Sequence, residues 1–303
     1  MTDSGHQALG ATGARKLANT TKTPVQMPAI TPRWLVTFLQ WKPLESGTLR
    51  VNRVKTDDPV EVACSQQDEG DLPEDYVDYE ENPREYTLSA ISTILNIQTR
   101  VSDLFSSPFD QIREQLRLTI ESVKERQESE LVNNADYGLL NSIAPFMRVQ
   151  PRKAAPTPDD MDELISRVWK EPAFFLAHPL AIAAFGRECT RRGVPPATVT
   201  LFGSPFLTWR GLPIVPCDKL YVEEGKSNIL LLRTGEKKQG VVGLFQPGLA
   251  GEQSPGLSVR FMGIQTNAVA QYLIALYCSA AVLVPDALGV LENVDVGLYH
   301  EYK

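Results

Sequence analysis

The chain has 303 residues and a formal net charge of −7, and 43% of its residues are hydrophobic and 22% are charged. These values are typical of a globular protein with one or two domains, each large enough to bury a hydrophobic core. The acidic balance, and the lack of a basic segment with interleaved aromatic residues, disfavour a protein whose main task is to bind nucleic acid.

The first 30 residues are small and polar, with many threonines, alanines and glycines. They lack the apolar stretch of a secretory signal and hold too few apolar residues to fold alone. We therefore expect an arm that is disordered or is ordered only by a partner. The apolar segment 31–41, which contains Trp34 and Trp41, is expected to anchor this arm to the folded part of the chain.

A strongly acidic segment follows a strand predicted over residues 46–54. Residues 57–85 hold twelve acidic side chains and one basic side chain, so this segment carries −11 and the rest of the chain carries +4. A solvated loop is the simplest interpretation. A docking loop is the alternative, because two tyrosines lie in the segment, Tyr76 and Tyr79, and Tyr86 follows it directly. A strand-like pattern resumes over residues 85–97, and an excursion of about 40 residues is unusual without a binding role.

One long helix is predicted over residues 109–134. Apolar residues recur in its first half at steps of three and four, at Phe109, Ile112, Leu116, Ile120 and Val123. Ser107 is a suitable N-cap, and Pro108 suits the first helical position. The run 124–130 contains no apolar residue. We interpret it as a solvated helix end; the alternative is that it lies against a polar surface of another subunit.

After this helix the sequence predicts two further helices and a series of strands. Asp159 or Asp160 is expected to cap the next helix, and residues 178–192 are predicted as another helix, stopped by Gly193. Six short apolar stretches between residues 197 and 264 are separated by turn residues and are predicted as strands.

The apolar run 266–283 is predicted as a buried helix. Its solidly apolar part, residues 272–284, is about 13 residues long, which is too short to span a bilayer. Residues 287–294 are predicted as a last strand. Helices and strands therefore occur together without a repeated strand–helix–strand unit, and the predicted fold class is α+β.

The sequence gives little support for a catalytic or metal site. The four cysteines are Cys64, Cys189, Cys217 and Cys278. They form no C-x-x-C pair, and their scattered positions suit reduced thiols in a cytoplasm. The histidines are scattered along the chain like the cysteines. A thiol–imidazole dyad would require His178 to lie near Cys189 or Cys217. We therefore predict no catalytic residue, no bound cofactor and no metal.

Two segments with glycines resemble ligand loops but suit other roles better. Residues 225–227 read GKS, yet Leu220 stands where a phosphate-binding loop requires glycine, so a hairpin turn is predicted. The glycine-rich stretch 240–256 is interpreted as a mobile loop, with a loop that lines a pore or a ligand as the alternative.

The sequence resembles a known family over about residues 31–303. The segments that carry the likeness include RVNRV at 50–54, YVDYE at 76–80, PREYTL at 83–88, RVSDLFSSP at 100–108, QLRLTIESVKERQE at 115–128, AFGRECTRRGVPPATVTLFG at 184–203, TWRGLPIVPCDKLYV at 208–222 and RTGEKKQGVVGLFQPGLAGEQSPG at 233–256. They resemble encapsulins of the second family, in the branch called family 2A, whose shells enclose a cysteine desulfurase.

This resemblance implies a capsid fold of the Hong Kong 97 phage type. The implied parts are an N-terminal arm (1–33), an anchor segment (34–46), an extended loop (47–90), a peripheral domain (91–171) with a spine helix (108–134), an axial domain (172–285), and a return strand with the C-terminus (286–303). The strand 287–294 is expected to return to the peripheral sheet.

The resemblance also implies self-assembly into a closed icosahedral nanocompartment. Such a shell would lie in the cytoplasm, enclose a cysteine desulfurase and take part in sulfur metabolism or storage. Pyridoxal phosphate would belong to the cargo enzyme, and the shell protein would bind neither nucleic acid nor membrane. The alternatives are a phage-type major capsid protein that packages DNA and, from another class, a stand-alone soluble enzyme.

Two groups of residues are candidates for roles in such a shell. Contacts between the extended loop and the next subunit are expected at Tyr76, Tyr79, Tyr86 and Arg84. The glycines Gly248 and Gly251 are candidates for lining a pore at a symmetry axis.

Overall fold

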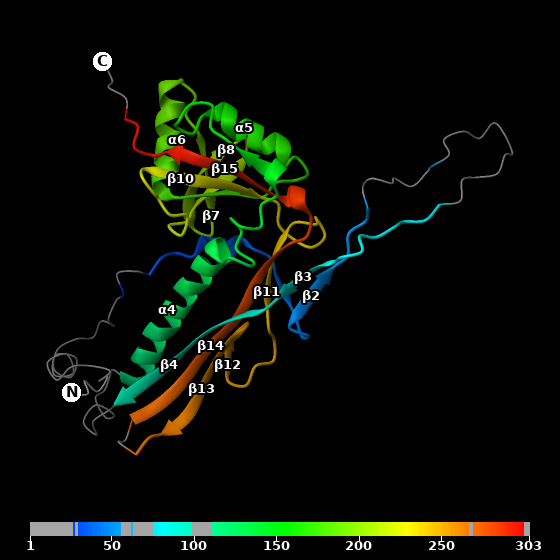
Figure 1. Ribbon diagram of the computed structural model, residues 1–303. Coiled ribbons are helices and arrows are strands. Elements are labelled where there is room, and N and C mark those ends of the chain that lie inside the picture. Colours follow the sequence, from blue (N-terminus) through cyan, green and yellow to red (C-terminus); the bar gives the residue numbers. More distant parts are fainter. Residues whose placement is uncertain are drawn as a thin grey trace.

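The computed structural model describes residues 27, 30–55, 62, 75–98, 111–266 and 269–299. These residues form two main β-sheets, one in a compact upper part and one in an elongated lower part (Figure 1). A two-stranded ribbon, β2 (Thr48–Val51) with β3 (Arg84–Thr87), leads away from the elongated part. The mixture of helices and sheets is the α+β class that the sequence predicts.

The compact part is built on a seven-stranded sheet. Its strands, in spatial order, are β5 (Arg148–Val149), β15 (Leu288–Asp295), β10 (Lys226–Leu232), β6 (Phe174–Ala177), β9 (Leu212–Pro216), β8 (Ser204–Trp209) and β7 (Ala197–Leu201). Helices α5 (Pro158–Arg167) and α6 (Pro179–Arg191) pack on this sheet and on each other. Strand β6, in the middle of the sheet, is apolar and buried at every position, as a strand covered on both faces should be.

The elongated part is built on a six-stranded sheet. Its strands are β1 (Trp41–Pro43), β11 (Val241–Phe245), β14 (Val269–Val282), β13 (Leu257–Ile264), β12 (Glu252–Ser254) and β4 (Ser89–Gln98). Strand β14 is the longest, and it pairs with β4 over the whole length of β4. The described residues also form two short 3₁₀ helices, η1 (Pro145–Met147) and η2 (Pro285–Ala287).

Helix α4 (Gln111–Asn133) joins the two parts. Leu116, Ile120 and Val123 pack on the strands of the elongated sheet, as their spacing predicts. At the other end, Leu131 and Val132 are fully buried in the core of the compact part. The predicted long helix is therefore confirmed over the described residues, whereas its expected cap at residues 107–108 lies outside them.

The run 266–283 is a strand, so the prediction of a buried helix there is wrong. It forms β14, which lies between β4 on one side and β13 and β11 on the other. A strand covered on both faces is apolar at successive positions, and periodicity alone does not distinguish such a run from a buried helix. Among the described residues, no helix has both the length and the apolar character needed to span a membrane.

The sheets also divide the chain differently from the predicted domains. Strand β15 covers the predicted last strand but pairs with β10 and β5 in the compact part, so its expected return to the sheet beside α4 is wrong. Conversely, β11 to β14 lie beside α4, although the predicted axial domain (172–285) included them. The reason is that, after α4 has led into the compact part, the chain crosses between the sheets twice more, after β10 and after β14.

Other local predictions are closer to the structure. All six stretches between residues 197 and 264 contain strands. The GKS segment is a hairpin turn, with Glu224 and Gly225 both at positive φ. Thr157 caps α5, rather than either predicted aspartate. The Asp160 side chain accepts the backbone N–H of Thr157, and Asp160 is the third helical residue, so the two residues form a capping box.

A buried arginine holds the two crossing segments together. Arg233, which follows β10, is 2% exposed, and its guanidinium pairs with Asp286 at 2.7 Å, in the turn that follows β14. Asp286 also pairs with Lys170 at 2.8 Å. Burial alone would raise the pKa of Asp286, but these two cations hold it below its usual range. The pair therefore fixes how the compact and elongated parts meet.

Removing the Asp286 charge is expected to destabilise the chain, because it leaves the buried Arg233 without its counter-ion. We expect Asp286→Asn to lower the free energy of unfolding by about 2 kcal/mol. The matched control is Glu171→Gln, which breaks an exposed pair with Lys238 and should change that energy by less than about 0.5 kcal/mol. Urea unfolding measures the free energy of unfolding of both variants. Similar losses for the two would contradict a stabilising role of the Arg233–Asp286 pair.

Candidate functional site

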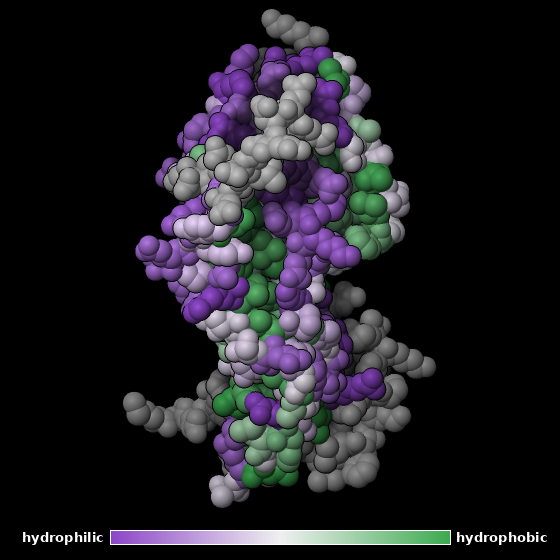
Figure 2. Space-filling view, turned by 90° about the vertical axis from the view of Figure 1, so that its right-hand side faces the viewer, coloured by the Kyte–Doolittle hydropathy of each residue, from purple (hydrophilic) through white to green (hydrophobic). Residues whose placement is uncertain are grey.

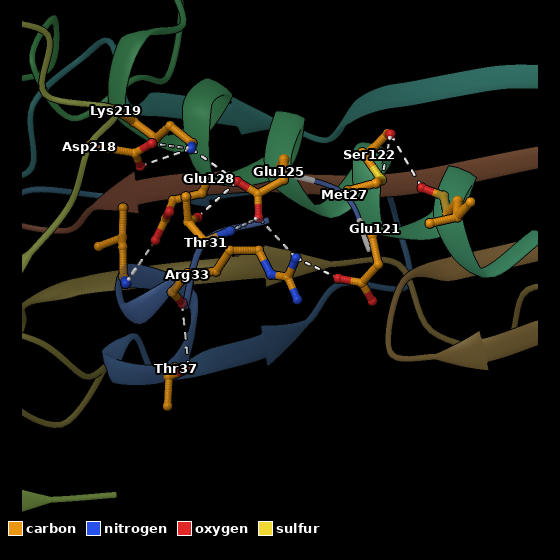
Figure 3. Close-up of polar contacts among 12 residues, drawn as sticks. Met27, Thr31, Arg33, Thr37, Glu121, Ser122, Glu125, Glu128, Asp218 and Lys219 are labelled. Atoms are coloured by element: carbon orange, nitrogen blue, oxygen red, sulfur yellow. Dashed lines mark hydrogen bonds and ion pairs between the residues drawn. The ribbon is translucent and has the colours of Figure 1, made fainter. Parts of the chain in front are cut away.

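The polar half of α4 binds the segment that begins the described N-terminal region (Figure 3). Glu125 Oε1 accepts a hydrogen bond from the backbone N–H of Thr31 at 2.9 Å, and Oε2 accepts one from the Thr31 hydroxyl at 2.8 Å. Lys219 donates to the same carboxylate at 3.0 Å. Burial alone would raise the pKa of Glu125, but these donors outweigh it and lower the pKa.

Arg33 extends this network along the helix. Its guanidinium pairs with Glu121 at 2.6 Å and with Glu125 at 3.0 Å. The Arg33 backbone is in the left-handed region, with φ of 49°, and it is the N-cap of the short helix α2 (Trp34–Phe38). A turn of this kind is strained for a residue other than glycine, and the two ion pairs hold it in place.

Glu128 is the buried member of the network. It is 1% exposed, and its Oε1 accepts the backbone N–H of Leu35 at 3.0 Å. This bond satisfies an N–H group in the first turn of α2 that has no partner within the helix. Burial raises the pKa of Glu128 to about 7, although the Leu35 bond and Lys219 act in the opposite direction. Asp218 and Glu125 add to the rise.

The interpretation of residues 124–130 as a solvated helix end is therefore wrong. Gln127 and Glu128 are buried, and Glu125 and Glu128 are held by residues 31–35 of the same chain rather than by another subunit. The reason is that a carboxylate can be buried where backbone N–H groups and cations satisfy it, and apolar periodicity does not detect this. On the exposed side of the helix, Arg126 and Glu130 form an ion pair at 2.5 Å.

The four candidate contact residues of the extended loop fall into two kinds of environment. Tyr76 and Tyr79 are 78% and 55% exposed. Tyr86 is buried, and its hydroxyl donates to the carbonyl of Val282 at 2.6 Å. Arg84 lies over the Tyr86 ring. The Tyr86 side chain is therefore packed within the chain, and contact of the four residues with another subunit stays a prediction; most of the acidic segment lies outside the described residues.

The glycine-rich stretch 240–256 is not one mobile loop, as its first interpretation held. It contains β11 and β12, with Gly248 and Gly251 both at φ of 70° in the turn between them. A Cβ at Gly251 would lie 2.4 Å from the carbonyl oxygen of Val259, whereas one at Gly248 would meet nothing within 4 Å. Glycine is thus required at Gly251 for close packing. The lining of a pore by Gly248 and Gly251 stays a prediction.

The three described thiols, Cys189, Cys217 and Cys278, are buried. Burial raises the pKa of Cys189 to about 11 and that of Cys278 to about 12, and it raises the pKa of Cys217 further still. His178 Nδ1 accepts the backbone N–H of Leu180 as the N-cap of α6. Over the ranges that the structure describes, no three His, Cys, Asp or Glu residues gather as a metal site would require. Cys64 lies outside these ranges.

The family is settled by comparison with known proteins. The family described as "Type 2A encapsulin shell protein SrpI-like" matches residues 46–298. The chain belongs to this family. It is 65% identical to the type 2A encapsulin shell protein SrpI of Synechococcus elongatus, over 100% of this chain and 99% of that protein. It is 60% identical to the type 2A encapsulin shell protein of Mycolicibacterium paratuberculosis, over 98% and 97%.

Solved structures place this encapsulin shell protein in the Hong Kong 97 capsid fold. It superposes on a chain of the holo-SrpI encapsulin complex of Synechococcus elongatus, seen by cryo-electron microscopy, with a TM-score of 0.86 and 62% identity, over 97% of this chain and 99% of that one. A capsid chain of a native GTA particle gives a TM-score of 0.63 at 13% identity, over 95% and 99%. A chain of Microbacterium phage Oxtober96 gives 0.65 at 11%, over 93% and 98%. The last two likenesses show the fold alone.

Neutralising Glu128 is expected to change how stability depends on pH. Because the folded chain holds this proton to a higher pH than the unfolded chain, the contribution of protonation is complete below pH 4.5, the ordinary value, and is lost as the pH rises to about 7. Glu128→Gln should therefore gain stability relative to the natural chain across this window, by up to about 3 kcal/mol.

Urea unfolding between pH 4.5 and 8 measures this difference. The matched control is Glu125→Gln. The pKa of Glu125 is lowered, so its contribution is lost only as the pH falls below its ordinary range, and the difference from the natural chain should stay constant above pH 5 or so. A constant difference for Glu128→Gln as well would show that the buried carboxyl does not titrate in this window.

The two glycines should respond differently to alanine. Gly248→Ala is expected to cost about 1 kcal/mol, the strain of a left-handed backbone, and Gly251→Ala more than about 2 kcal/mol because its Cβ meets Val259. Thermal unfolding measures both. Equal losses would contradict the close contact between a Cβ at Gly251 and the Val259 carbonyl oxygen. Only Gly248, where a side chain would meet no neighbour, is suited to a later test of pore dimensions.

Proposed function

We propose that many copies of this chain assemble into a closed icosahedral shell in the cytoplasm, a nanocompartment for an enzyme. The observation that carries this proposal is the near full-length likeness to a shell protein of an encapsulin complex. Contacts that repeat between unlike surfaces and close by rotation give rings, and rings about several axes close a shell. The ion pair between Arg233 and Asp286 suits this role, and so does helix α4, which joins the two parts, because both keep the subunit rigid.

Exposed apolar surface supports repeated contacts between copies. At the far end of the elongated sheet, Ile94, Phe261, Met262 and Ile264 are each more than half exposed. Figure 2 shows apolar side chains on the surface along the middle of one face and again at its lower end. Apolar patches of this kind on a water-soluble subunit mark contact surfaces. The exposed Tyr76 and Tyr79 on the ribbon side add two aromatic groups of the type enriched at such contacts.

We propose further that the enclosed cargo is a cysteine desulfurase, so that the shell serves sulfur metabolism or storage. The likeness to the desulfurase-enclosing branch of the family supports this. The cargo enzyme would bring its own pyridoxal phosphate, and the shell chain would hold no cofactor of its own. The described thiols are buried with raised pKa values, which disfavours their acting as sulfur acceptors.

Purification of the shell from its natural host tests both proposals. Electron microscopy should show closed, uniform particles, and proteins released from them by denaturation should include a desulfurase with the absorbance of pyridoxal phosphate. Nucleic acid in place of an enzyme would favour the capsid alternative. Particles that are uniformly empty would overturn the cargo proposal, and a monomer at physiological salt would overturn the shell.

Truncating the exposed tyrosines should weaken assembly without unfolding the subunit. We expect Tyr76→Ser with Tyr79→Ser to lower the affinity between copies by about tenfold or more, because aromatic groups buried at an interface each contribute about 1–3 kcal/mol. Mass photometry on dilution measures the fraction of intact particles. The control is Tyr221→Ser, an equally exposed tyrosine on the compact part, where particles should remain intact. Intact particles in both would remove the tyrosines from the contact.

A further inference from the structure

The α2 segment, residues 31–38, lies against α4 and covers the Glu128 carboxyl group (Figure 3). Glu128 is 1% exposed, and the backbone N–H of Leu35 donates to its Oε1 at 3.0 Å. If the α2 segment moved off α4, this carboxyl group would return to water. The position of the segment and the hydration of Glu128 are therefore linked.

The α2 segment has a suitable hinge at its C-terminal end. Helix α2 ends at Phe38, and Leu39, its C-cap, has an extended backbone. The next residue, Gln40, already accepts the backbone N–H of Gly243 in the elongated sheet, at 2.9 Å. Strand β1 can therefore stay in its sheet while the preceding residues move. At the other end, the left-handed backbone of Arg33 is strained, which favours release once its ion pairs loosen.

Aromatic rings of the compact part hold the other side of the α2 segment. Trp34 and Phe38 pack on Phe206, with ring centroids 5.1 and 5.6 Å apart. Phe38 also packs on Phe174 at 5.0 Å and on Phe202 at 5.2 Å. Burial of these rings favours the closed position, so an open position has a minor population. The balance between the two depends on the state of the carboxyl group that the segment covers.

Charged and titratable groups from three elements surround Glu128. They are Glu121 and Glu125 on α4, Arg33 in the α2 segment, and Cys217, Asp218 and Lys219 after β9, with His178 beside Asp218. Lys219 favours the ionised form of Glu128, but this ammonium also pairs with Glu125 and Asp218. Burial, with repulsion from Asp218 and Glu125 in addition, raises the pKa of Glu128 to about 7.

We propose that the α2 segment is a pH-sensitive latch. It closes over Glu128 while that carboxyl group is protonated, and its open position, reached by a swing about Leu39 and Gln40, gains population as the group ionises. The proton matters because an ionised carboxyl group is far more costly to keep from water than a neutral one. Residues 1–30 are joined to this segment, so their point of attachment to the fold moves with the latch. One subunit holds every part of it.

The direction of the pH effect follows from where the proton is held. In the closed position Glu128 keeps its proton up to about pH 7, whereas in water it loses the proton near the ordinary value of 4.5. The advantage of closing is therefore complete below pH 4.5 and is lost as the pH rises to about 7. Between pH 5 and 7.5 the open population should rise on the order of fiftyfold.

Hydrogen exchange of backbone amides, followed by mass spectrometry on the full chain from pH 5 to 7.5, tests the latch. After correction for the intrinsic pH dependence of exchange, a peptide that covers Leu35 should lose protection about fiftyfold. A peptide from the buried strand β6 should change by less than about twofold, which separates opening of the latch from unfolding of the subunit. An equal loss in both peptides, or no loss at Leu35, would overturn the inference.

The variant Glu128→Gln is close in size to the protonated group but cannot ionise, so protection at Leu35 should vary by less than about twofold over this range. The matched control is Glu125→Gln, three positions away. Because the pKa of Glu125 is lowered, it is ionised throughout this range, and the control should keep the loss of about fiftyfold. Both variants retain His178, so titration of that histidine cannot produce the difference. The full loss in Glu128→Gln as well would reject the role of Glu128.

Cleavage by trypsin after Arg33 gives a second measurement, which needs no variant. This bond lies at the start of α2, so cleavage reports the open position. Division by the cleavage rate of a free peptide of residues 29–39 removes the pH dependence of trypsin itself. From pH 6 to 8 the ratio should rise on the order of tenfold. A constant ratio would overturn the inference, even if Glu128→Gln failed to fold.

Discussion

The structure depends on two carboxyl groups on α4, the partly buried Glu125 and the buried Glu128. Residues 31–35 cover both groups, and a carboxyl group withdrawn from water requires hydrogen-bond donors. Here the donors are backbone N–H groups of the anchor and the ammonium of Lys219 in the compact part. The same few bonds therefore place the N-terminal anchor, the long helix and the compact part relative to one another.

Rigidity at this junction matters for a shell. The compact and elongated parts are joined by α4 and by two crossing segments, which Arg233 and Asp286 hold together. If the angle between the parts varied freely, copies in contact would not reproduce one curvature, and a closed container requires a repeated rotation. Interior charge pairs add little net stability, but they specify geometry, which is the property that assembly needs.

The side of the subunit that carries the β2–β3 ribbon differs from this junction, because it leaves aromatic groups exposed. Tyr76 and Tyr79 are largely exposed. Groups of this kind gain most when a second molecule covers them, because the aromatic rings lose contact with water. The projecting ribbon side therefore offers aromatic surface that the proposed contact with a second copy would cover.

The sequence alone determined the family likeness, the α+β class, the long helix and most strands of the compact part. These follow from local signals: periodicity, turn residues and extended motifs. It did not determine that 266–283 is a strand, that Tyr86 points inward, or that Glu128 is buried. Each of these depends on what covers the residue from elsewhere in the chain. Only the tertiary structure supplies that cover, because partners distant in sequence leave no local pattern.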